Sequence, residues 1–259
     1  MSLRFKNLGS GSTGNATLIA SFDGVRHRYL LVDCGMPLRR LTARLQQAGV
    51  EPDQLQAVFI THEHDDHIGC AEQLVLRYRI PALMSRGTYM ALGQPDWNGL
   101  YQPVRDGDVL DVAGMQLQPF TVPHDAREPL QLRCTDGDRV LGIATDLGHA
   151  TPHVIRHLQH CHALVLESNH DPDMLAASTY PAFLKRRVAG QEGHLSNGAA
   201  AELLATLQHG ALGHVVAAHL SLQNNRPELA AQSLAAALAR QPDELAVACA
   251  KEGCAWLTV

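Results

Sequence analysis

The chain passes at residues 57–67 from the apolar run AVFI into the polar cluster THEHDDH. The seven residues of this cluster carry three imidazoles and three carboxylates, which are groups that bind divalent ions such as zinc or manganese. His62 and His64 share a face in extended backbone. Asp66 and His67 lie beyond them, in position to reach a second ion. The H-x-H-x-D-H spacing therefore predicts the start of a two-metal site where a buried strand ends; a solvated polar loop is the alternative.

Three further candidate ligands each follow an apolar run that is typical of a strand. His124 follows residues 117–123, Asp146 follows residues 140–145, and His219 follows residues 214–218. Several strands that end at one edge form a pocket there, so we expect these side chains to join the 61–67 cluster. A lone histidine after a strand is more often structural than ligating. Here ligation is favoured because the three residues follow the 61–67 cluster in this order along the chain.

Short motifs along nearly the whole chain form a wider pattern. They are GSGSTGN (9–15), LVDCG (31–35), THEHDDH (61–67), HDA (124–126), TDLG (145–148), ESNHD (167–171), YP (180–181), GHLSN (193–197), and HLS (219–221) with Asn224 and Asn225. Together they resemble the metallo-β-lactamase-fold hydrolases, and more narrowly the YycJ/WalJ family, which is described as acting as nucleases. The motifs together are far more specific than the metal cluster alone.

The resemblance implies two groups of metal ligands that one carboxylate bridges: His62, His64 and His124 on one ion, Asp66, His67 and His219 on the other, and Asp146 between them. Asp125 could bind in place of its neighbour His124. Asp33 would hold the histidine loop, because ligating imidazoles need their other N–H fixed; the alternative is a turn residue before Gly35. The cofactors would be two divalent ions, Zn²⁺ or Mn²⁺, since imidazole and carboxylate accept either.

Hydrolysis is the reaction that such a centre favours. Water between two divalent ions has its pKa lowered to roughly 7 in the best zinc sites, which yields a bridging hydroxide. We count Asp66 as catalytic as well as ligating. Glu167 and His194 resemble catalytic helpers of the ribonuclease Z relatives, and together they would protonate the leaving oxygen. The alternative for His194 is to cap the helix that starts near residues 196–197.

Most of the other histidines, of 15 in the chain, are expected to be structural. His153, His157 and His160 fall at helical spacing and predict a polar helix face. His149 and His170 lie near the pocket by motif, and either substrate contact or structural hydrogen bonding fits them. The loop at residues 10–15 could approach a phosphate through backbone N–H groups or could be a hairpin turn.

Composition is consistent with one enzyme domain that spans residues 1–259. A chain of 259 residues with 46% hydrophobic residues can fill a large α/β core. No run approaches the roughly 18 apolar residues of a membrane span, and Met1 to Asn15 does not resemble a signal peptide, so we expect a cytoplasmic protein with no membrane partner. The six cysteines lack C-x-x-C spacing and indicate reduced thiols.

The apolar spacing predicts alternating helices and strands after N-terminal strand pairs. Helices are expected at 38–48, 68–79, 198–208 and 227–240, and strands near 16–20, 29–33, 58–60, 109–112, 115–121, 140–144, 163–167 and 215–218. Periodicity alone supports only the α/β class; the resemblance implies a four-layer αβ/βα sandwich of two mixed sheets flanked by helices. The stretch between Asp146 and His219 is too short for a β-CASP insertion, and a tRNA-gripping arm has no obvious room, so we expect the minimal core.

Charge bears on the substrate. A net charge of −5 and a pI near 6.3 argue against a strong, sequence-independent grip on nucleic acid. Basic residues cluster locally at 39–44, 77–79 and 185–187, and the last cluster could steer a phosphate backbone or be a solvated helix end. The resemblance implies a DNA exonuclease (5′ to 3′) in genome maintenance, with DNA favoured over RNA. The alternatives are a small-molecule hydrolase acting on a thioester, lactone or cyclic phosphodiester, an RNA-processing nuclease, and a non-catalytic metal-binding protein.

Overall fold

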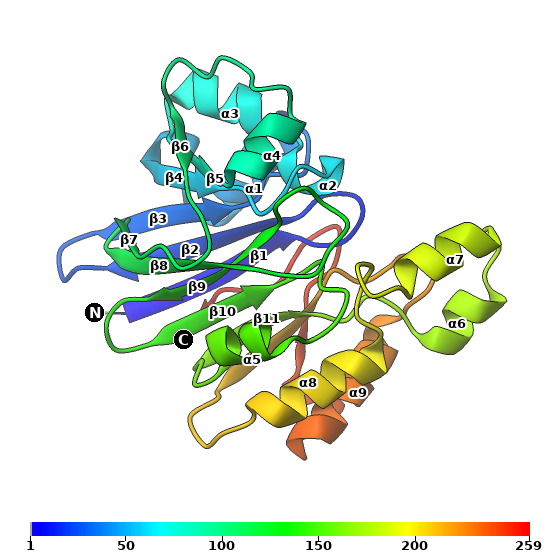
Figure 1. Ribbon diagram of the computed structural model, residues 1–259. Coiled ribbons are helices and arrows are strands. Elements are labelled where there is room, and N and C mark those ends of the chain that lie inside the picture. Colours follow the sequence, from blue (N-terminus) through cyan, green and yellow to red (C-terminus); the bar gives the residue numbers. More distant parts are fainter. Residues whose placement is uncertain (1) are drawn as a thin grey trace.

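Two mixed sheets of seven strands form the centre of the protein, whose computed structural model describes residues 2–259 (Figure 1). The first has the order β14-β1-β2-β3-β4-β5-β6, with β14 (Leu257–Thr258), β1 (Ser2–Gly9), β2 (Ala16–Phe22), β3 (His27–Val32), β4 (Leu55–Phe59), β5 (Ala82–Met84) and β6 (Tyr101–Pro103). The second has the order β13-β12-β11-β10-β9-β8-β7, with β13 (Ala246–Val247), β12 (His214–Ala218), β11 (Ala163–Glu167), β10 (Val140–Ala144), β9 (Leu130–Thr135), β8 (Met115–Thr121) and β7 (Leu110–Val112). Each sheet changes from antiparallel to parallel pairing, at β3–β4 and at β10–β11.

Three separate apolar cores give the protein four layers. One core lies between the sheets and includes Phe5 from the first and Leu132 from the second. A second core lies between the first sheet and helices α1 (Leu38–Gln47) and α3 (Ala71–Tyr78). The third lies between the second sheet and helices α5 (Pro152–Leu158), α8 (Asn197–Leu207) and α9 (Pro227–Leu238). The four-layer αβ/βα sandwich is therefore confirmed.

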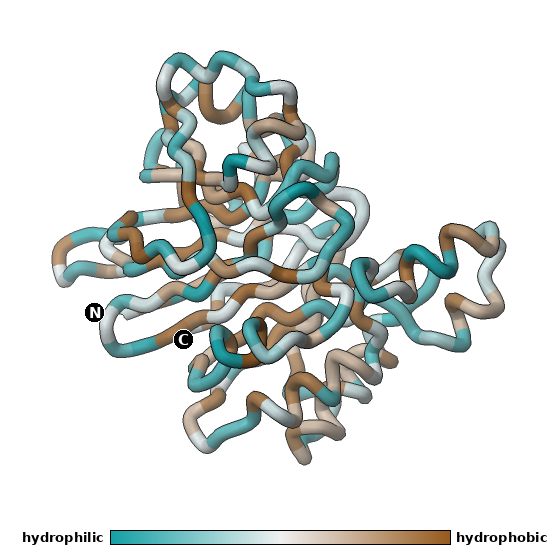
Figure 2. The backbone as a smooth tube through the Cα atoms, viewed as in Figure 1, coloured by the Kyte–Doolittle hydropathy of each residue, from teal (hydrophilic) through white to brown (hydrophobic). Residues whose placement is uncertain are grey.

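Strand β4 is covered on both faces, which explains why apolar and polar residues do not alternate in the run AVFI. Ala57 and Phe59 belong to the core between the sheets, whereas Val58 and Ile60 belong to the core under α1 and α3. Successive side chains of a strand point to opposite faces, and both faces of this strand are covered. The strand therefore ends buried, and the polar cluster begins where it ends. Figure 2 shows the same concentration of hydrophobic residues along the inner strands.

The helix predicted at 68–79 is wrong as a single element. The structure has a short helix α2 (Asp65–Ile68), a break at Gly69 with φ 31°, and then α3. A β carbon at Gly69 would lie 2.6 Å from backbone atoms of Cys34 and Gly35, so any side chain there would collide with them. The other three predicted helices are confirmed to within two residues at either end.

The remaining elements are α4 (Arg86–Ala91), the 3-10 turns η1 (Pro52–Gln54) and η2 (Pro242–Glu244), and two short helices, α6 (Pro172–Ala177) and α7 (Ala182–Val188). Figure 1 shows α6 and α7 as a hairpin that projects away from the sheets, which the expectation of a minimal core did not anticipate. None of the helices in residues 2–259 combines the length and apolar character needed to cross a bilayer.

Candidate metal centre

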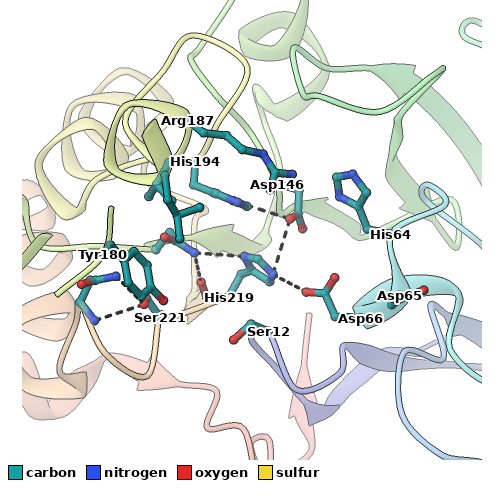
Figure 3. Close-up of a pocket in the computed structure, with 14 residues that line it drawn as sticks. Ser12, His64, Asp65, Asp66, Asp146, Tyr180, Arg187, His194, His219 and Ser221 are labelled. Atoms are coloured by element: carbon teal, nitrogen blue, oxygen red, sulfur yellow. Dashed lines mark hydrogen bonds and ion pairs between the residues drawn. The ribbon is translucent and has the colours of Figure 1, made fainter. Parts of the chain in front are cut away.

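The predicted site residues come together at one edge of the two sheets. Strand β4 ends before the 61–67 cluster, β8 before His124, β10 before Asp146, β11 at Glu167 and β12 before His219. Strands β10, β11 and β12 are parallel neighbours, so the residues that follow them stand side by side. Asp146 and His219 have positive φ angles of 56°, a conformation that non-glycine residues adopt rarely and that is enriched at active sites. Of the predicted site residues, Figure 3 shows His64, Asp66, Asp146, His194 and His219 around the pocket.

One group of nitrogen donors consists of His62, His64 and His124. His62 Nε2 and His64 Nδ1 are 3.1 Å apart, and His124 Nε2 lies 3.3 Å from the same His64 nitrogen. His124 Nδ1–H donates to the carbonyl oxygen of Gly193 (3.1 Å), which leaves its Nε2 lone pair free in the neutral ring. Burial lowers the pKa of His62 and His124, so both rings are held in the neutral form that binds metal.

A second group consists of Asp66, His67 and His219. His219 Nε2 lies 3.3 Å from Asp66 Oδ2, and His67 Nε2 lies 3.8 Å from it. The outer nitrogen of each ring is occupied: His67 Nδ1–H donates to Asp33 (2.8 Å) and His219 Nδ1–H to Glu167 (3.1 Å). The inner nitrogens therefore face carboxylate oxygens, an arrangement that needs a positive charge between them.

Asp146 lies between the two groups. Its Oδ2 is 3.0 Å from His67 Nε2, and its Oδ1 is 3.5 Å from His219 Nε2 and 3.7 Å from His124 Nε2. Burial opposes ionisation of Asp146, yet His219 and His67 hold its pKa well below the usual range. Although burial acts in the opposite direction, Asp146 and neighbouring carboxylates raise the pKa of His219 to about 10. The site thus favours added positive charge strongly.

These donors fit a divalent metal. When His67 donates its Nδ1–H to Asp33, the neutral ring has no proton at Nε2 to give to Asp146 Oδ2, and this buried oxygen is left without a hydrogen bond, which is costly. In each of three overlapping sets the candidate ligand atoms lie within 4.8 Å of one another: His62, His64 and His124; His62, His67 and Asp146; and Asp66, His67 and His219. Metal ions prefer such mixtures of imidazole and carboxylate.

Asp33 holds the histidine loop, as the resemblance implies. Its carboxylate accepts hydrogen bonds from the Thr61 N–H (2.8 Å), the Thr61 hydroxyl and His67 Nδ1–H. Gly35 lies directly under the loop, where a β carbon would be 1.7 Å from the carbonyl oxygen of Asp66. Asp33 and Gly35 therefore fix the positions of Asp66 and His67.

Glu167, which is buried, and His194, which is half-buried, form a pair beside Asp146. His194 Nδ1–H donates to Glu167 Oε1 (2.8 Å), while Glu167 Oε2 accepts from the backbone N–H groups of Leu147 (2.7 Å) and Leu195 (3.1 Å). Burial lowers the pKa of His194, but Glu167 outweighs it and the net shift is upward. The cap of α8 is Ser196, whose hydroxyl accepts from the backbone of residue 199, so His194 does not have the alternative capping role.

The loop at residues 10–15 is more than a hairpin turn. The side-chain amide of Asn15 lies 3.0 Å from the Asp66 carbonyl oxygen and 3.0 Å from His67 Nε2. The hydroxyl of Ser10 accepts from the backbone N–H of His219 (2.7 Å). The loop thus contacts all three residues of the second ligand group, a role for Asn15 that the sequence reasoning missed although the motif contains it.

The remaining candidates have different positions. Asp125, the alternative to His124, forms an ion pair with Arg187, which lies on α7 over the pocket. His170 is buried and its Nδ1 has no partner, whereas the His149 ring is bonded to the backbone oxygen of Gln191 (2.8 Å). His153 and His157 lie on α5, away from the pocket.

Similarity to known proteins agrees with this geometry. A family model described as the Metallo-beta-lactamase superfamily matches residues 9–180. The chain is 33% identical over 244 residues to "Exodeoxyribonuclease YycJ" of Bacillus anthracis, covering 92% of this chain and 90% of that protein. It is 28% identical over 242 residues to "Exodeoxyribonuclease WalJ" of Streptococcus pneumoniae, covering 92% and 88%. The crystal structure of the metallo-beta-lactamase fold protein YhfI from Bacillus subtilis superposes over 100% of both chains with a TM-score of 0.76 at 15% identity.

Proposed function

Because the chain belongs to the metallo-β-lactamase superfamily of hydrolases, and within it to the family of YycJ and WalJ, we propose that it is a metal-dependent phosphodiesterase that removes nucleotides from the ends of DNA. The observation that carries the proposal is the similarity to YycJ over nine tenths of both chains. A role in genome maintenance and a 5′ to 3′ direction are part of the same proposal.

The donors that would hold two metal ions are those of the pocket floor: His62, His64 and His124 for one, Asp66, His67 and His219 for the other, and Asp146 between them. Bound there, zinc or manganese would activate water and neutralise charge on the phosphoryl group. Asp66, whose side chain is more exposed than that of Asp146, would accept a hydrogen bond from the attacking water.

The pair of Glu167 and His194 would protonate the leaving oxygen. The hydrogen bond from Nδ1–H to Glu167 fixes the ring, which lines the pocket (Figure 3), and leaves Nε2 for the substrate. A proton held at Nε2 could then pass to the alkoxide of the departing nucleotide. Burial opposes ionisation of Glu167, but His194 and His219 lower its pKa to about 2. The two backbone N–H groups hold the carboxylate in place, so the imidazole keeps its orientation.

Polar groups on the pocket walls would bind the phosphate and sugar. Arg187 projects from α7 over His194 and Asp146, while Ser12 and Ser221 lie on the opposite side (Figure 3). A guanidinium suits a phosphate because it offers several N–H donors in one plane. Arg187 is paired with Asp125 and would be shared between that carboxylate and the substrate.

DNA labelled at either end, incubated with Mn²⁺ or Zn²⁺, tests the proposal. When the DNA carries the label at its 5′ end, we expect labelled mononucleotide from the first turnover. When it carries the label at its 3′ end, we expect labelled mononucleotide only late in the reaction. Faster cleavage of an RNA of the same sequence would indicate an RNA-processing nuclease instead. Turnover of a thioester or lactone with intact DNA would indicate a small-molecule hydrolase, and elemental analysis of the purified protein would identify the metal.

A further inference from the structure

The hairpin of α6 and α7, here named the arm (residues 172–188), contributes almost nothing to the cores. α6 buries Leu175, and α7 buries none of its seven residues; every other α-helix in residues 2–259 buries at least one. A helix this short has little stability of its own, yet the arm is held at three points. Asp171 caps α6, the Lys185 ammonium of α7 donates to the carbonyl oxygen of Ala176 at the end of α6 (2.6 Å), and Arg187 pairs with Asp125 outside the arm. The arm is therefore an ordered projection that presents its surface outward.

The exposed surface of the arm combines an aromatic ring with positive charge. Phe183 is 66% exposed, and it is the aromatic among the four large hydrophobic side chains that are exposed in the described chain. Three of the seven residues of α7 are basic and none is acidic, although the whole chain has a net charge of −5. Figure 2 shows hydrophobic and hydrophilic stretches alternating along this hairpin. Such a surface fits an anionic partner with flat apolar groups.

The arm is also a wall of the pocket. Tyr180, Leu184, Arg187 and Val188 line the same cavity as Asp146 and His194. In Figure 3 Arg187 and Tyr180 stand beside the catalytic candidates. A polymer whose end lies over Asp146 therefore meets the arm as soon as it leaves the pocket.

We propose that the outer face of α7 is a binding site for single-stranded DNA, in which a base stacks on Phe183 and a backbone phosphate pairs with Arg186, which is exposed one helical turn further along. Exposed aromatic rings beside basic residues bind single strands in this way, because every base has a flat face for stacking. In a duplex the base faces are already covered, so the site selects unpaired strands. This inference rests on the proposed function and names the form of DNA that it acts on.

Phe183→Ala tests the stacking contact. We expect the ratio of kcat/KM for a single-stranded oligonucleotide to kcat/KM for bis(p-nitrophenyl) phosphate to fall about tenfold, because the small ester occupies only the pocket and Phe183 does not line it. Phe183→Trp should restore the ratio. Val25→Ala is the matched control, because Val25 is 88% exposed and lies outside the pocket. An unchanged ratio, or an equal fall for duplex DNA, would overturn the assignment.

The charge contact has its own test. In Arg186→Ala, the slope of the logarithm of the binding constant against the logarithm of salt concentration should decrease by roughly 0.7, which is the contribution of one phosphate contact on a single strand. Arg77→Ala removes the same charge outside the pocket and should leave the slope unchanged. Equal slopes in wild type and Arg186→Ala would contradict the proposal.

The two proposals fail in different ways. If the wild type cleaves DNA but the arm variants behave like it, the arm has no such role and the proposed function stands. If the wild type cleaves no DNA, fluorescence anisotropy with a labelled oligonucleotide still tests the arm: tighter binding by wild type than by Phe183→Ala supports it, and equal binding overturns it.

Discussion

The floor of the pocket and the arm above it are built in opposite ways. On the floor, His62, His67, Asp146 and Glu167 are almost completely buried, and every one of them lies within hydrogen-bonding distance of a neighbour. On the arm, α7 buries none of its residues, and Phe183 and Arg186 are exposed to solvent. Chemistry at a metal centre needs donors that are fixed before the substrate arrives, whereas holding a long flexible polymer needs only an accessible surface. Substitutions on the floor should therefore cost far more than substitutions on the arm.

Asp146→Ala should have the largest effect. It removes the carboxylate that lies between the two groups of imidazoles, so we expect activity to fall by at least about a thousandfold and the bound metal to decrease. Elemental analysis measures the bound metal, and the end-labelled DNA assay measures the activity. Asp53→Ala, at an exposed position, is the control. Full metal content together with wild-type turnover in Asp146→Ala would show that the residues of the pocket floor do not form the catalytic metal centre.

His194→Ala should come next, and it separates proton transfer from metal binding. Loss of a general acid costs about 10²- to 10⁴-fold in rate, while His194 belongs to neither group of metal ligands that we propose, so the metal content should stay near wild type. His149→Ala is the matched control, since that histidine is bonded to a nearby backbone oxygen and does not line the pocket. Turnover near wild type in His194→Ala would remove this residue from the mechanism.

Asp33→Asn should have a smaller effect that extra metal reverses. The neutral amide has a single acceptor oxygen and no negative charge, so it cannot accept hydrogen bonds from both Thr61 and His67 Nδ1–H as the carboxylate does. The His67 ring then loses its fixed tautomer. We expect about a 10- to 100-fold loss of metal affinity, measured by competition with a chromophoric chelator, and recovery of activity at saturating metal. Activity that stays low at saturating metal would mean that Asp33 does more than orient the ring.

The sequence alone was sufficient to predict those parts of the pocket floor whose residues are close together in the chain. The run AVFI predicts a strand, and His62 to His67 lie within seven residues, so their proximity requires no knowledge of topology. The meeting of His124, Asp146 and His219 depends on strand order, which the resemblance supplied and periodicity did not. The break at Gly69 was not predictable, because it results from contact with Cys34 and Gly35, far away in the chain.

The arm was missed for a related reason. Helices are recognised in a sequence by apolar residues three or four positions apart, and that spacing arises because one face is buried. α7 has no buried face, so the pattern that would reveal it is absent. The basic residues 185–187 were noted, but nothing in the sequence placed them over the pocket that His194 and Asp146 form.

The smallest expected effect is that of Phe183→Ala on stability, and it sharpens the contrast between the two regions. Phe59 is buried between the sheets at the end of β4, so Phe59→Ala should lower the free energy of unfolding by about 3–5 kcal/mol. The same change at Phe183, which is 66% exposed, should alter it by less than about 0.5 kcal/mol. Urea denaturation of both variants measures the difference. A large loss at Phe183 would mean that the ring supports the fold, and the reduced DNA activity of that variant would then need no stacking contact to explain it.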